Sequence, residues 1–71
     1  MTTIDILKNL ARIHQMLSLR DEAQRAGDPE SLLVVKMMEH AVADTRQRLK
    51  DGVPGSRFDE LCRQHPSLIP A

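Results

Sequence analysis

Apolar residues recur at alternating steps of four and three along two stretches of the chain. The first stretch runs from Ile4 to about Ala26, and the second from about Pro29 to Asp51. This spacing is typical of a helix that packs lengthwise along another helix. The seam residues are Ile6, Leu10, Ile13 and Leu17 in the first stretch and Val35, Met38, Val42, Thr45 and Leu49 in the second. The pattern predicts two α-helices of nearly equal length.

The residues between these stretches predict a tight turn. Gly27 suits the left-handed residue that commonly ends a helix, and Asp28 followed by proline fits the start of the next one. A connection this short makes the two helices antiparallel neighbours. Thr2 or Thr3 can cap the first helix, with Asp5 in its first turn. The chain therefore predicts an antiparallel helical hairpin.

A shorter helix is expected over about residues 57–64. Ser56 resembles its cap, and Asp59 follows three residues later, as in a capping box. The apolar side of this helix contains Phe58, Leu61 and Cys62. The tail 65–71 begins with His65 and a proline and is predicted to be extended, and to be loose unless Leu68 and Ile69 dock. Residues 1–71 thus form a single small all-α domain.

A two-helix hairpin cannot cover every apolar side chain of the second helix. Those outside its seam are Leu32, Leu33, Val34, Met37 and Ala41. Two hairpins packed as a homodimeric four-helix bundle would cover most of them. A monomeric three-helix fold, with Phe58 and Leu61 lying over the hairpin, is the alternative. The width of the apolar surface favours the dimer.

Apolar residues that lie outside the two seams are candidates for binding a partner protein. They are Met16, Leu19, Leu32, Leu33 and Met37. The competing interpretation is that the third helix covers them. If they stay exposed, they predict a small adaptor or inhibitor that acts by occluding or sequestering an unidentified protein.

The amino-acid composition favours association of the chain with another copy of itself, and it disfavours nucleic acid as a binding partner. The chain has 71 residues, one Phe and no Trp or Tyr, which limits the core that one copy can build. Ten basic and ten acidic residues give no formal net charge, whereas phosphate binding favours a basic surface. The residues of an alternative nucleic-acid-binding surface are Arg12, Arg20, Arg46, Arg48 and Lys50.

No residue pattern predicts catalysis, a metal or a cofactor. His14, His40 and His65 lack a compact metal-ligand spacing. Cys62 cannot form an intramolecular disulfide because it is the only cysteine, and we expect it to be a buried, inert thiol. The carboxylates have basic neighbours at helical spacing, such as Asp21 with Arg25, which predicts solvated ion pairs. We expect a protein that is not an enzyme.

The sequence shows neither a signal-peptide pattern nor an apolar run long enough to span a membrane. A cytoplasmic location is therefore expected. At the level of pattern the chain resembles small phage-encoded anti-activator proteins that inhibit host quorum sensing. The resemblance covers the opening segment 1–7, the first helix end at Glu22, the polar turn with Asp28, and a second helix to about Arg48. It implies a dimeric hairpin that binds host regulatory proteins in the host cytoplasm.

Overall fold

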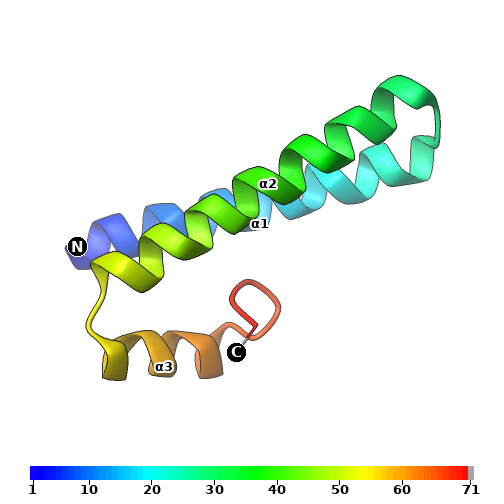
Figure 1. Cartoon of the computed structure of the whole chain (residues 1–71). Helices are drawn as coiled ribbons and strands as arrows, with labels where there is room; N and C mark the ends of the chain where they lie inside the picture. Colours follow the sequence, from blue (N-terminus) through cyan, green and yellow to red (C-terminus); the bar gives the residue numbers. More distant parts are fainter. Residues whose placement is uncertain (71) are drawn as a thin grey trace.

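The structure, a computed structural model, describes residues 1–70 and contains three α-helices and no strand in that range. The helices are α1 (Thr3–Ala26), α2 (Pro29–Gly52) and α3 (Gly55–Gln64). Figure 1 shows α1 and α2 as an antiparallel hairpin, with α3 turning back beneath one half of α2. The molecule is 41 Å long and 18 by 17 Å across. The predicted all-α hairpin with a short third helix is confirmed.

Side-chain and glycine caps set the ends of the two long helices. The Thr2 hydroxyl accepts a hydrogen bond from the Asp5 amide at 3.2 Å, and the Asp5 carboxylate accepts one from the Thr2 amide. Gly27 adopts a left-handed backbone with a φ of 73°, and its amide donates to the Ala23 carbonyl. Asp28 then caps α2 by accepting from the Ser31 amide. This two-residue connection reverses the chain direction.

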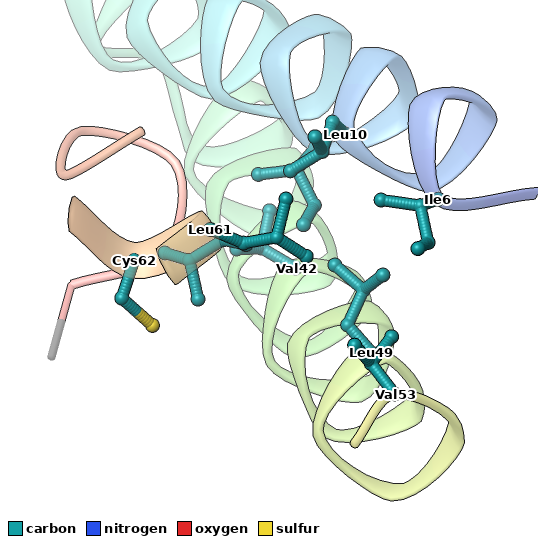
Figure 2. Close-up of a cluster of buried hydrophobic side chains, with 9 residues drawn as sticks. Ile6, Leu10, Val42, Leu49, Val53, Leu61 and Cys62 are labelled. Atoms are coloured by element: carbon teal, nitrogen blue, oxygen red, sulfur yellow. The ribbon is translucent and has the colours of Figure 1, made fainter. Parts of the chain in front are cut away.

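The main core lies in the half of the hairpin that is farther from the turn, where α1 begins and α2 ends. We call this the proximal half, and the half next to the turn, residues 15–40, the distal half. Ile13 and Leu49 are completely buried where α1 meets α2. Figure 2 shows Leu10, Val42 and Leu61 converging from α1, α2 and α3. Three elements therefore contribute side chains to one cluster in the proximal half.

The start of α3 differs from the predicted capping box. The helix begins at Gly55, with Pro54 in the cap position and no side-chain cap. The Phe58 amide donates to the Pro54 carbonyl at 2.8 Å, so that carbonyl already accepts the first bond of the helix. Ser56 lies inside the helix, and its predicted role as the cap is wrong.

The tail after α3 turns back onto the helices, so the prediction of an extended tail is wrong for residues 65–70. The amides of Leu68 and Ile69 both donate to the His65 carbonyl, at 3.0 and 2.9 Å. Ile69 is buried in the core cluster. The Arg46 Nε donates to the Leu68 carbonyl at 2.7 Å. Burial of one isoleucine and this charged hydrogen bond hold the tail in place. Residue 71 lies outside the described residues.

Candidate protein-interaction surface

The seam predicted from the spacing lies inside a single hairpin. The buried members are Ile6, Leu10, Ile13, Val35, Val42, Thr45 and Leu49. Leu17 and Met38 are half-buried nearer the turn. The Thr45 hydroxyl donates to the Ala41 carbonyl at 2.8 Å, which satisfies the one polar group in this row. The seam is thus used within one chain, and a second molecule would have to contact other residues.

The distal part of α2 exposes four large apolar side chains within six residues. Leu32, Leu33, Val34 and Met37 are 47%, 62%, 39% and 63% exposed. Successive residues of a helix point about 100° apart, so these side chains occupy several sides of α2. Only Val35 in this group is buried against α1. A helix that is apolar on several sides is normally covered on several sides.

The third helix does not reach this segment. It has ten residues and is therefore ~15 Å long, and it runs back from the end of α2. The tail that follows contacts α2 at Arg46. Figure 1 shows that the distal half of the hairpin extends beyond both α3 and the tail. The interpretation that the third helix covers Leu32, Leu33 and Met37 is therefore wrong.

The two flanks of the hairpin differ. In an antiparallel pair, residues that directly follow seam residues emerge on one flank, and residues that directly precede them emerge on the other. Ala43, Arg46 and Lys50 follow seam residues and border the groove beneath α3 and the tail. We call the opposite flank the open flank. The residues on it that directly precede seam residues are Asp5, Asn9, Arg12, Met16, Val34, Met37, Ala41, Asp44 and Arg48.

On α1, the two residues proposed for partner binding differ in their exposure. Leu19 is 45% exposed, whereas Met16 is half-buried against the core cluster. The structure also exposes Ile4 and Leu7, which lie one turn apart in the proximal half and were missing from the predicted set. Their sequence signal was present, because both fall outside the four-and-three spacing of Ile6 and Leu10.

The five basic residues of the alternative surface are distributed over different parts of the molecule. Arg20 pairs with Asp21 at 3.0 Å, and Arg46 is committed to the tail. The pKa of Arg46 is lowered mainly by burial of its guanidinium and, to a smaller extent, by the nearby charge of Arg20. Lys50 lies on the α3 flank, while Arg12 and Arg48 lie on the open flank. These residues therefore do not gather into one basic surface that could follow a phosphate backbone.

The groove between α2, α3 and the tail has a volume of about 530 Å³. Its lining residues are Ala43, Arg46, Gln47, Lys50, Phe58, Asp59, Cys62, Ile69 and Pro70. Cys62 contributes the only thiol, and its side chain is buried. A second hollow, of about 420 Å³, is bordered by Asp21, Gln24 and Arg25 on the surface of α1. Neither place combines a nucleophile, a base and an oriented third group.

Over residues 1–70 there is no cluster of three or more His, Cys, Asp or Glu side chains that could hold a metal ion. Over the same range, no helix is both long enough and apolar enough to cross a membrane. Two local salt bridges form among the charged side chains of this range, Arg20 with Asp21 at 3.0 Å and Arg57 with Glu60 at 3.1 Å. The unusual feature of this surface is the exposed apolar segment of α2.

Comparisons with protein-family models, with curated proteins and with solved structures find no match to this chain. Any proposal for the function of this protein therefore rests on the geometry of the hairpin. Its most distinctive part is the distal half, where apolar side chains of α2 stay exposed on the sides that α1 does not cover.

Proposed function

We propose that this protein is a small non-enzymatic binding module, a homodimeric inhibitor or adaptor that occludes or sequesters another protein in the cytoplasm. Its contact residues are the exposed apolar side chains of the distal half, with Leu32, Leu33 and Met37 at the centre. The resemblance to phage anti-activators suggests that a host regulatory protein is the partner. No cofactor or metal takes part in this mechanism.

The observation that carries this proposal is the exposed segment 32–37 of α2. Water is an unfavourable environment for four large apolar side chains, and burying the part of each that is still exposed would contribute roughly half of the about 1.5–3 kcal/mol gained when a fully exposed side chain is buried. Their clustering on one helix matches the way an amphipathic helix enters a hydrophobic groove or accepts a second helix. Scattered single apolar residues would not support such a role.

The exposed apolar residues also support the dimer in this proposal, because a helix that is apolar on several sides needs more than one covering surface. A second copy would cover one side, and the bound protein would cover another. Sedimentation measurements at micromolar concentration test the dimer directly. A stable helical monomer under those conditions would contradict it.

Site-specific photo-crosslinking tests the contact with another protein. A photoreactive amino acid at Leu33 should capture a defined protein in the native cell, and the same amino acid at the exposed Arg63 of α3 should not. The captured protein is then purified and titrated calorimetrically with the unmodified chain. Leu33→Glu should bind it roughly thirtyfold more weakly, as expected for a contact at the centre of an interface.

A matched substitution controls for effects on the fold. Lys36→Glu also introduces an exposed carboxylate into the distal half of α2, but it removes no apolar side chain. It should leave the affinity nearly unchanged. Equal binding by the Leu33→Glu and Lys36→Glu variants, both fully helical, would contradict the proposed contact surface.

A further inference from the structure

The seam changes along the hairpin from buried and apolar to exposed and polar. Residues equally far from the turn lie at the same level, so each seam residue of α1 faces one of α2. Continuing the spacing past Leu17 brings Arg20 and Gln24 into the seam. From the end away from the turn, the facing pairs are Ile6 with Leu49, Leu10 with Thr45, Ile13 with Val42, Leu17 with Met38, Arg20 with Val35 and Gln24 with Ser31. Every member of the first three pairs is buried, and both members of the fourth are half-buried.

The two pairs nearest the turn bury little apolar surface. Val35 faces Arg20, whose charged side chain is 32% exposed. Gln24 is exposed, and Ser31 is half-buried. We call residues 18–37 the tip, and Val35 is the only buried residue in that range. Because packed helices are held together mainly by burial of apolar side chains, α1 and α2 associate more weakly in the tip than in the proximal half.

The polar contacts of the tip stabilise each helix separately. Arg20 pairs with the adjacent Asp21 at 3.0 Å, and the Arg25 Nε donates to the Asp21 carbonyl at 3.3 Å. The Ser31 amide donates to the Asp28 carboxylate at the start of α2. None of these bonds joins α1 to α2. In the proximal half, by contrast, α3 and the tail share one buried cluster with both long helices.

We infer that the tip unfolds locally as a unit while the proximal half stays folded. The boundary is the level of Leu17 and Met38, where the seam stops being buried. Because a two-residue turn joins the helices directly, they separate at the tip only if the end of α1 and the start of α2 unwind. Such sub-global opening requires less free energy than unfolding of the whole chain.

This device goes beyond the proposed function and acts on the segment named there. Leu32, Leu33 and Met37 all lie in the tip, so they are presented on a helix only while the tip is closed. The equilibrium between the closed and open tip therefore sets the fraction of molecules that present this segment in helical form.

Hydrogen exchange on the full chain, at a concentration where it is monomeric, tests the inference. Amides of the tip should be protected at least about tenfold less than amides of residues 42–49. Ile69→Val should lower the protection of residues 42–49 by about two- to tenfold, because their exchange requires that the core around Ile69 open. The same variant should leave the tip unchanged, since Ile69 stays packed when only the tip opens.

Arg20→Leu tests the cause of the opening. A leucine facing Val35 extends the apolar seam, so protection of the tip should rise by about tenfold. Protection of residues 42–49 should rise with it, because unfolding of the whole chain breaks the same contact. Arg12→Leu is the matched control, since Arg12 is an exposed residue of α1 outside the seam, and it should change neither.

Equal protection in the tip and in residues 42–49 would overturn the inference, because the hairpin would then open as one unit. A loss of protection in the tip on Ile69→Val, as large as that in residues 42–49, would overturn it in the same way. Equal protection of the tip in the Arg20→Leu and Arg12→Leu variants would show that the polar seam does not cause the opening. The crosslinking at Leu33 tests partner binding separately from each of these results.

Discussion

The two halves of the hairpin share one helical seam but differ in what covers it. In the proximal half, α3 and the tail add a further layer, and Ile13, Leu49 and Ile69 are almost completely buried. In the distal half only α1 and α2 meet, and Leu33 and Met37 remain more than 60% exposed. A seam is sufficient to join two helices, whereas burying the rest of their apolar surface requires another layer. The proximal half contains that layer over part of its surface, with Ile4 and Leu7 still exposed, and the distal half lacks it.

This comparison predicts where a charged substitution is tolerated. Leu49→Asp should abolish cooperative folding, because a carboxylate would be placed among completely buried apolar side chains. Leu33→Asp should retain the helical circular-dichroism signal and a sigmoidal urea transition. The comparison would be contradicted if both variants unfolded, or if Leu49→Asp remained folded.

Substitutions that remove a smaller amount of apolar surface should lower the free energy of unfolding more in the proximal half than in the distal half. Ile69→Ala should lower the free energy of unfolding by about 2–4 kcal/mol, since it leaves a cavity in the proximal core. Leu32→Ala, at a half-exposed distal position, should change it by less than ~0.5 kcal/mol at concentrations where the chain is monomeric. Urea titration of both variants gives the two values. An Ile69→Ala effect no larger than that of Leu32→Ala would show that the tail contributes little to the core.

The turn of the distal half depends on one glycine. Gly27→Ala places a β-carbon on a residue with a φ of 73°, which should cost about 1–2 kcal/mol in the free energy of unfolding. Gly55→Ala is the matched control, because Gly55 has no positive φ and no atom within 4 Å of the added carbon. That variant should be neutral or slightly stabilising. Thermal unfolding of the pair measures the difference, and equal melting temperatures would contradict the role of Gly27.

The smallest expected effect is a pH dependence at the cap of α2. Hydrogen bonds from the Ser31 side chain and amide lower the pKa of Asp28 below its usual value of 3.8. The stabilisation by this carboxylate is therefore present above pH 3.8 and is lost as the pH falls through the lower, folded pKa. The NMR shift of the Ser31 amide should titrate with a midpoint below 3.8. Asp28→Asn should keep the cap and remove that titration, and a midpoint above 3.8 would contradict the hydrogen-bonded carboxylate.

The hairpin was predictable because its signals are local. Apolar spacing and the cap at Asp28 each act within a few residues, so the pattern identified both long helices and the turn at Gly27. The folded tail was not predictable in the same way. Ile69 enters a cluster built largely by α1 and α2, and Arg46 contacts a carbonyl 22 positions away. Such contacts have no local sequence signal.

The ion pair predicted from helical spacing was wrong. Asp21 was expected to pair with Arg25, four residues later, but the structure pairs it with Arg20. Exposed side chains exchange ion-pair partners at little energetic cost, so spacing alone does not select one. The apolar candidates for partner binding in the distal half were identified because they lie outside the seam positions. Their exposure depended on the length and direction of α3, and their role in binding stays a prediction.

The contact between Arg46 and Leu68 has a consequence for the lifetime of the protein. Proteolytic enzymes act on segments that can be drawn out in an extended form. Here the segment from His65 to Ile69 is turned inward, and a guanidinium holds its backbone. Cleavage of the backbone within this segment therefore requires that Ile69 leave the core first. The rate at which an added protease cuts here should follow the opening of the proximal half, which links susceptibility to proteolysis to the integrity of the core.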